Sequence, residues 1–133
     1  MAIDTTQLLG AIQTALTGDA TLTAIVPAAS IGNHLKDDIS FPHIIYGLEA
    51  ENAGIKGQTG YVFALVIDIW SDYRGEKQVW QIHNAIAGIF DRSPVSIASG
   101  TNTYLHFDSI QVDLEGDGRT RHGTIVYNLM VTE

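Results

Sequence analysis

The sequence contains no cysteine, which excludes disulfide bonds, thiolate metal sites and a cysteine nucleophile. It also lacks a cluster of lysine and arginine of the kind that neutralises phosphates, since 7 basic residues stand against 15 acidic ones and the formal charge is −8. We therefore expect no tight binding to nucleic acid. An acidic wall can still matter near DNA, because it repels a passing strand and keeps the strand from adhering.

Long apolar runs are missing as well. No stretch approaches the ~18 apolar residues of a membrane span, and the start of the chain, MAIDTTQLLGAIQTAL, has neither the basic residues nor the apolar run of a signal peptide. We expect no contact with a membrane. We also expect a protein that is made and kept in the cytoplasm, unless an assembly carries it out.

What is present fits one folded domain that spans residues 1–133. The length suffices for a single hydrophobic core, and a hydrophobic content of 45% is that of a folded protein. No internal repeat and no low-complexity linker divides the chain.

Two main helices and a short one are predicted from the apolar spacing. Residues 5–17 place large aliphatic side chains at three- and four-residue steps and end before Gly18. Asp19 can then cap a shorter helix that ends before Pro27, because the residue ahead of a proline avoids helical angles. The segment 74–90 predicts the second main helix. Its apolar stripe consists of Val79, Ile82, Ile86, Ile89 and Phe90, with His83 inside it.

Alternating segments predict β-strands. One strand starts behind Pro42, where Ile44, Tyr46 and Leu48 share a face. The segment 61–70, YVFALVIDIW, is largely apolar on both faces. It predicts a central strand that is covered by a helix on one side and by a partner subunit on the other.

The remaining strands complete an α+β fold. Two further strands are predicted at about 103–113 and 119–131, and the glycine-rich stretch 52–60 predicts a long hairpin loop. Successive strands lie close enough in sequence to pair as antiparallel hairpins. We therefore expect an antiparallel sheet of four or five strands with the two main helices packed on one face.

The stretch DLEGDGRTRHG, residues 113–123, has the densest charge in the chain and partly resembles a calcium loop. Three carboxylates occupy alternate positions and a glycine follows them. Position twelve of such a loop must supply a bidentate glutamate, but Thr124 stands there, and two arginines lie where ligands should point. We therefore expect no metal site in this stretch.

A hairpin is the better interpretation of the same residues. With Gly118 in the left-handed conformation, residues 116–118 form a three-residue loop. The cross-strand pairs that follow are Glu115 with Arg119, Asp113 with Arg121, and Phe107 with Tyr127. Each pair contributes roughly 0.2 to 1 kcal/mol, which is enough to choose a register but does not imply a site. A four-residue loop that sets Leu114 against Arg119 is the alternative.

Catalytic patterns are weak. The five histidines show no zinc-site spacing, and His83 is expected to be a partly buried core residue beside Trp80 and Ile86. His106 and Asp108 share a predicted strand face and could orient an imidazole as a base, although two solvated side chains are the simpler interpretation. No serine lies in a nucleophile elbow and no glycine-rich loop cradles a phosphate. We expect no enzyme, no cofactor and no metal.

Four stretches of the chain together carry a family resemblance. They are LLGAIQTALTGDATLTAIV, FPHIIYG, VIDIWSDYRGEKQVWQIHNAI and DGRTRHGTIVYNLMV. With these, nearly the whole chain resembles the tail completion or tail terminator proteins of long-tailed phages and of phage-derived gene transfer agents. The resemblance implies a small α+β subunit that forms a homo-hexameric ring on the last ring of the tail tube, stops its polymerisation and docks onto the head-side neck.

The resemblance also implies partners and a location. The partners would be the tail tube protein and the head-side stopper protein, with DNA passing through the ring without specific binding. The protein would be assembled in the host cytoplasm and would end in the tail or neck of the virion.

Six residues are candidates for subunit or partner contacts. They are Lys56 and Gln58 in the predicted loop, and Glu115, Asp117, Arg119 and Arg121 in the predicted hairpin. Two other functions remain open: another head-tail neck protein, such as a stopper or adaptor, and a small-ligand or enzymatic α+β module. The second of these requires a closed pocket around His106 and Asp108.

Overall fold

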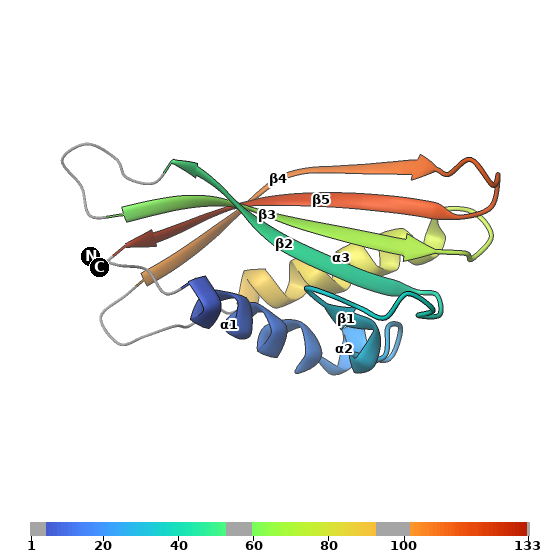
Figure 1. Ribbon diagram of the computed structural model, residues 1–133, viewed down its shortest axis with the longest axis horizontal. Helices are drawn as coiled ribbons and strands as arrows, with labels where there is room; N and C mark the ends of the chain where they lie inside the picture. Colours follow the sequence, from blue (N-terminus) through green and yellow to red (C-terminus); the bar gives the residue numbers. More distant parts are fainter. Residues whose placement is uncertain (1–4, 53–59, 93–101, 133) are drawn as a thin grey trace.

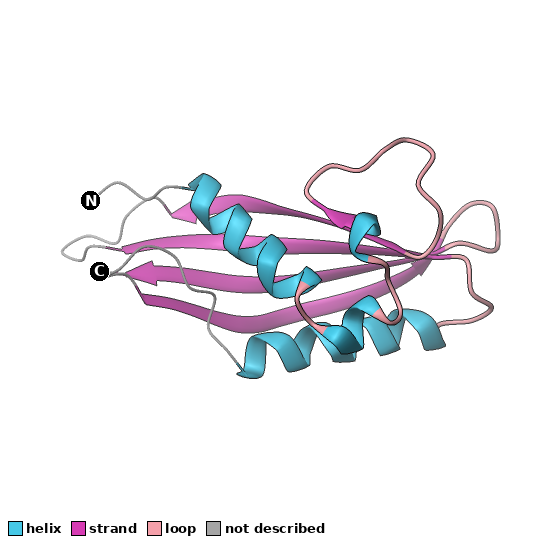
Figure 2. Cartoon of the chain, turned by 90° about the horizontal axis from the view of Figure 1, so that it is seen from below, coloured by secondary structure: helices cyan, strands magenta, loops and turns pink. Residues whose placement is uncertain are grey.

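A helical layer covers one face of a five-stranded sheet (Figures 1 and 2). The computed structural model describes residues 5–52, 60–92 and 102–132, and the structural statements that follow refer to these residues. Most of the predicted loop, residues 53–59 with Lys56 and Gln58, lies outside them. The layered arrangement follows from the sequence pattern, because alternating strands and amphipathic helices each have one apolar side to bury.

The sheet is mostly antiparallel, as predicted. Its strands are β1 (Ile31–Gly32), β2 (His43–Asn52), β3 (Gly60–Ser71), β4 (Asn102–Leu114) and β5 (Arg121–Thr132). Their spatial order is β1-β2-β3-β5-β4, which places β3 in the centre and β4 at one edge. The short β1 pairs in parallel with β2, so the sheet is mixed. The predicted α+β class is confirmed.

The helices lie close to their predicted positions. They are α1 (Thr5–Thr17), α2 (Ala20–Thr23), a single 3-10 turn η1 (Ala28–Ser30) and α3 (Lys77–Arg92). Asp19 caps α2 as predicted, by accepting a hydrogen bond from the backbone N–H of Leu22 at 3.0 Å. The predicted start of the second main helix at Arg74 is wrong by three residues, because Gly75 has a φ of 78°, a left-handed angle that a helix excludes. None of the helices within the described ranges has both the length and the apolar character needed to cross a bilayer.

One face of the sheet and the helices share the hydrophobic core. Full burial of an aliphatic side chain contributes ~1.5 to 3 kcal/mol, so this layer supplies most of the driving force for folding. The largest fully buried side chains are Leu8, Ile12, Leu16, Leu22, Ile44, Leu65, Ile67, Ile69, Ile82, Ile86, Ile125 and Leu129. They come from α1, α2, α3 and the three inner strands, as the alternation of the sequence predicts.

The second face of β3 is largely apolar but has no helix over it in the described part of the chain (Figure 1). Val62, Val66 and Trp70 lie there and are only half-buried. The central position of β3 is confirmed. Cover of this second face by a partner subunit stays a prediction.

A short relay of side-chain amides ties α1 to the sheet. The hydroxyl of Tyr46 donates to Gln13 Oε1 at 2.6 Å, and Gln13 Nε2 donates to the carbonyl oxygen of Ile31 at 2.9 Å. Asn33 Nδ2 donates to the carbonyl oxygen of Tyr46 at 2.6 Å, on the edge of β2 that faces away from β3. Burial raises the pKa of Tyr46, so the hydroxyl keeps the proton that it donates.

The start of α3 approaches the sheet most closely at Gly123 of β5. A Cβ atom at this position would lie 2.7 Å from Cγ1 of Val79 and 3.6 Å from Cβ of Ile69. Real Cβ atoms do not come so close to another carbon. Glycine is therefore required where the helix crosses β5.

Replacement of this glycine should destabilise the fold. Gly123→Ala is expected to lower the free energy of unfolding by roughly 1 to 3 kcal/mol, because the added methyl overpacks the contact with Val79. Urea denaturation of Gly123→Ala, Val79→Ala and the double variant measures the coupling between them. Gly116→Ala is the control, since a Cβ there has nothing within 4 Å. If the losses of unfolding free energy caused by Gly123→Ala and Val79→Ala simply add in the double variant, the two side chains do not clash and the overpacking is contradicted.

Candidate functional site

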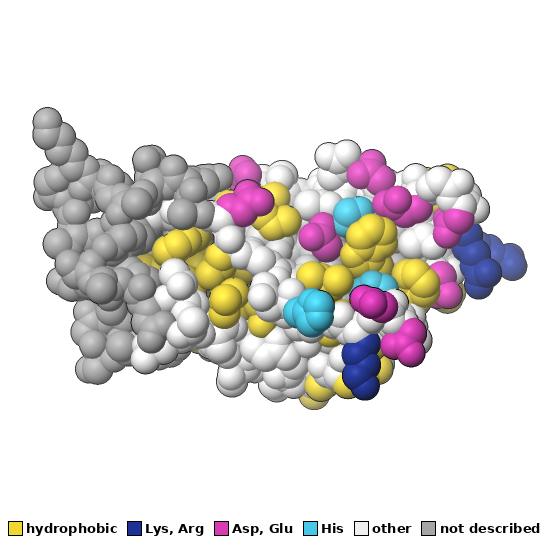
Figure 3. Space-filling view, in the orientation of Figure 1, with side chains coloured by type: hydrophobic (Ala, Val, Ile, Leu, Met, Phe, Trp, Pro, Cys, Tyr) yellow, Lys and Arg dark blue, Asp and Glu magenta, His cyan; other side chains and the backbone are white. Residues whose placement is uncertain are grey.

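The hairpin between β4 and β5 lies beside the loop that follows β3. Asp72, Arg74 and Gly75 from that loop and Gly118, Arg119 and Arg121 from the hairpin line a common cleft of about 450 Å³. In the space-filling view, hydrophobic, acidic and histidine side chains gather over this half of the molecule, with basic side chains at the end where the hairpin lies (Figure 3). The predicted charged stretch is thus part of a surface that two segments build together.

The turn itself differs from the predicted one. The N–H of Gly118 donates to the carbonyl of Glu115 at 3.0 Å, and the N–H of Glu115 donates to the carbonyl of Thr120 at 2.8 Å. These bonds close a loop over residues 116–119, one residue longer than predicted. Gly118 has a φ of 71°, so its predicted left-handed conformation is confirmed.

The register explains the difference. Phe107 lies opposite Tyr127 as predicted, but a bulge between Phe107 and Ser109 adds Asp108 to β4 as an extra residue. Above the bulge the pairing is therefore shifted by one position. Leu114 opposes Arg121 and Asp113 opposes His122. The predicted pairs of Glu115 with Arg119 and of Asp113 with Arg121 are wrong, and so is the alternative that set Leu114 against Arg119.

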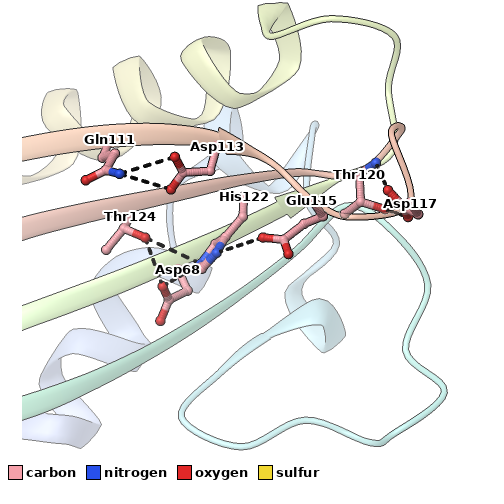
Figure 4. Close-up of polar contacts among 8 residues, drawn as sticks. All are labelled: Asp68, Gln111, Asp113, Glu115, Asp117, Thr120, His122 and Thr124. Carbon is pink, nitrogen blue, oxygen red and sulfur yellow. Dashed lines mark hydrogen bonds and ion pairs between the residues drawn. The ribbon is translucent and has the colours of Figure 1, made fainter.

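Asp117 closes the turn with its side chain (Figure 4). Its carboxylate accepts hydrogen bonds from the N–H of Arg119 at 2.9 Å, from the N–H of Thr120 at 2.8 Å and from the Thr120 hydroxyl at 2.6 Å. The Thr120 hydroxyl, followed by the two backbone donors, lowers the pKa of Asp117 to about 2. The ionised carboxylate is therefore part of the turn, while its predicted role as a partner contact stays a prediction.

The two arginines have partners outside the hairpin. Arg119 Nη2 lies 3.8 Å from Asp72 Oδ2, and Arg121 Nη1 lies 4.0 Å from Glu76 Oε2. An exposed pair at such a distance contributes ~0 to 1 kcal/mol, so the guanidinium group of Arg119, whose side chain is 75% exposed, is available to another molecule. The side chain of Arg121 is only 26% exposed. The buried Nε of Arg121 has no hydrogen-bond partner among the described residues.

On the bare face of the sheet, His122 joins residues from three segments (Figure 4). Its Nε2 lies 2.7 Å from Asp68 Oδ1, and its Nδ1 lies 3.3 Å from Glu115 Oε1. The indole of Trp70 stacks on the imidazole, with ring centroids 3.8 Å apart and planes 8° apart. Sequence reasoning missed this group, although Asp68 is the one charged residue in the apolar segment 61–70, and that is a usable signal.

This group has the parts of a proton relay, but the hydroxyl beside it lies at long hydrogen-bond distances. Thr124 Oγ1 lies 3.4 Å from both Asp68 Oδ1 and His122 Nε2, which is long for activation of a hydroxyl nucleophile. Within the described ranges, no group of three or more histidine, cysteine or acidic side chains is arranged to hold a metal ion. The contacts join β3, β5 and the hairpin across the sheet, and this is a structural role.

The other histidines follow the simpler interpretations. His83 is half-buried with its ring 5.7 Å from that of Trp80, as predicted, and burial lowers its pKa. His106 and Asp108 are both exposed on the edge strand β4, and neither lines the cleft beside the hairpin. The geometry offers no support for a closed pocket around them.

The comparison with known families decides the class of protein. The family model described as Tail completion protein gp17 matches residues 10–132. The chain belongs to this family. As a tail completion protein it is a tail-associated structural protein of the phage type, and the resemblance noted from the sequence is confirmed.

Similarity to a solved structure extends over the whole fold of the tail completion protein. A chain in the structure titled "Virion of native gene transfer agent (GTA) particle" superposes with a TM-score of 0.78 at 19% sequence identity, and the match covers 97% of each chain. At this identity the match shows the shared fold. No curated protein sequence matches the chain significantly.

The carboxylate of Asp117 provides a pH test of the hairpin. Its pKa is lowered from 3.8 to about 2, so its contribution to stability is present above pH 3.8 and is lost as the pH falls toward 2. Asp117→Ala should therefore be less stable than the parent protein at neutral pH, and the gap should close over this acid range. Thermal unfolding as a function of pH measures the gap, and Asp108→Ala on the exposed bulge is the control. An NMR titration that gives Asp117 an ordinary pKa would contradict the turn geometry.

Proposed function

We propose that this tail completion protein forms a hexameric ring that caps the tail tube, stops its polymerisation and joins the tail to the head-side neck. The observation that carries the proposal is the family match over residues 10–132. The fold shared with a chain of a gene transfer agent virion supports it. In this function the partners are five further copies, the tube protein and a neck protein, assembled in the host cytoplasm.

The exposed surface of the subunit supports an assembly role. β4 is a 13-residue edge strand that contains neither lysine nor proline, and the bulge at Asp108 is the one interruption of its pairing with β5. Phe107 and Leu114 on this strand are each about half exposed, at 51% and 50%. Large apolar side chains on an open edge favour contact with another protein.

The charge of the subunit suits a ring through which DNA passes. A formal charge of −8 per copy repels the phosphate backbone, so a passing strand does not adhere to the wall. No enzymatic step is part of this function.

The candidate contact residues belong to this proposal. Lys56, Gln58, Glu115, Asp117, Arg119 and Arg121 are proposed to lie at subunit or partner interfaces. The side chain of Arg119 is 75% exposed at the end of the hairpin, against 26% for Arg121 and 38% for Glu115. Its weak pair with Asp72 leaves it free to exchange partners.

Electron microscopy of growing tail tubes tests the function. With the purified protein present, tubes should have a bounded length and carry a sixfold cap at one end. Tubes that grow without limit despite a folded protein would contradict the proposal. Binding to the head-side connector in place of the tube would instead favour a stopper or adaptor.

Charge reversal tests the hairpin as a partner contact. Arg119→Glu should reduce the fraction of capped tubes while the protein stays folded, because its long, exposed ion pair contributes little to the fold. Lys36→Glu is the matched control, since Lys36 is an exposed cation in the loop between β1 and β2. Equal capping by both variants would remove Arg119 from the interface.

A further inference from the structure

The bulge in β4 creates an apolar stripe that the subunit covers only in part. Below the bulge Leu105 and Phe107 oppose residues of β5 that face the helices, and above it Ile110, Val112 and Leu114 do the same. Without the extra residue, this face would present serine, glutamine and aspartate above Phe107. The bulge therefore places all five apolar side chains on one face.

The helices cover this stripe only in part. α3 packs against β3 and β5 and runs along the β4 side of the sheet (Figure 2), and Leu105, Ile110 and Val112 are partly buried against the core. Phe107 remains 51% exposed and Leu114 50%, and Trp80 on the adjoining surface of α3 is 40% exposed. The imidazole of His83 lies between the two aromatic rings, at 5.7 Å from Trp80 and 5.5 Å from Phe107. We call Leu105, Phe107, Ile110, Val112, Leu114 and Trp80 the β4 stripe.

A shallow hollow lies toward the opposite edge of the sheet. Its volume is about 570 Å³, and α1, η1, β1 and the residues after β1 form it. Its lining includes Leu9, Gly10, Gln13, Ala28, Ala29 and Leu35. Within residues 5–35 the one charged side chain is Asp19, which is not part of the lining. We call this surface the α1 hollow.

Gly10 is a second, independent sign of contact at the α1 hollow. It lies in the middle of α1, where glycine is among the least favourable residues for a helix. A Cβ at this position would meet nothing within 4 Å, so packing inside the subunit does not require glycine. A close approach from another molecule would explain it.

We propose that the β4 stripe of one copy packs into the α1 hollow of the next copy. The inference rests on the proposed ring and names its subunit interface. β1 and β4 are the two edge strands, so the patches lie on opposite sides of each subunit (Figure 1). Two different patches on opposite sides make a head-to-tail contact, and such a contact builds a ring when the rotation between successive copies closes, as the proposed hexamer requires.

The chemistry of the two surfaces favours a second copy as the occupant. Phe107 and Trp80 supply the large anchors that dominate interface energies, and a hollow floored by glycine and alanine provides room for them. Depletion of charge is typical of the buried centre of an interface. The lining of the hollow, which also includes Asn33 and His34, has no carboxylate, lysine or arginine, so it can cover apolar side chains without the cost of burying such an ion unpaired.

Site-specific cross-linking tests the contact, since the natural chain has no cysteine to interfere. Phe107→Cys combined with Gly10→Cys, treated with a short bis-maleimide, should give a ladder of covalent oligomers up to the hexamer. Tyr104→Cys with Gly10→Cys is the matched control and should give no ladder. Tyr104 is exposed to the same degree as Phe107, at 50% against 51%, but it lies on the other face of β4. Equal ladders from both pairs would overturn the inference.

Substitutions at the two surfaces distinguish a role in assembly from a role in the stability of the single subunit, because assembly and folding should respond differently to them. Gly10→Leu should raise the melting temperature of the single subunit, because leucine is a better helix former, and it should prevent ring assembly. Phe107→Glu should also prevent assembly with the subunit folded, whereas Tyr104→Glu should assemble normally. Light scattering and circular dichroism measure assembly and folding separately.

The outcomes separate this interface from the ring itself. If the parent protein forms rings and Phe107→Glu forms them equally well, the interface is wrong and the ring stands. If the parent protein forms no ring but the cysteine pair still links copies, the contact between the β4 stripe and the α1 hollow is supported and the hexameric ring is contradicted. Absence of both rings and cross-links would overturn both proposals.

Discussion

Burial of one face of the sheet beneath α1 and α3 is the interaction on which the rest of this subunit depends. The side chains of β2, β3 and β5 on that face are fully buried, and they fix the inward side of every strand. The positions of the uncovered surfaces follow from this burial. The second face, the edge strand β4 and the hairpin are left to water or to other proteins, and these are the surfaces that a tail completion protein has for assembly.

Much of the fold could be predicted from the sequence, because a helix or strand with one buried face repeats its apolar residues at a regular spacing. Aliphatic spacing located α1 and α3, and alternation located β2, β3 and β5 within a few residues. The start of α3 was misplaced because the left-handed Gly75 delays the helix, and a glycine's dihedral angle is not visible in a pattern of apolar residues. The parallel pairing of the two-residue β1 was equally invisible, since so short a strand carries no period.

The hairpin shows where sequence reasoning failed and why. Counting residues from the turn assumes an uninterrupted ladder, and the bulge at Asp108 breaks that assumption. A signal for it was available. Apolar residues stand at 105 and 107 and then at 110, 112 and 114, so the alternation slips by one place. The contact of His122 with Asp68 joins residues 54 positions apart, and charge pairs at that separation follow only from the order of the strands.

The amide of Asn33 has a consequence for how the subunit assembles. An exposed strand edge offers its carbonyl groups to any other strand, and this is the usual route to open-ended fibres. By donating to the carbonyl of Tyr46, Asn33 occupies one acceptor on the outer edge of β2. A further strand that added along β2 would lose one of its backbone hydrogen bonds at Tyr46, so the amide weakens strand addition on this side of the sheet. This protection acts on the β2 side alone, and β4 is left as the edge that another strand could extend.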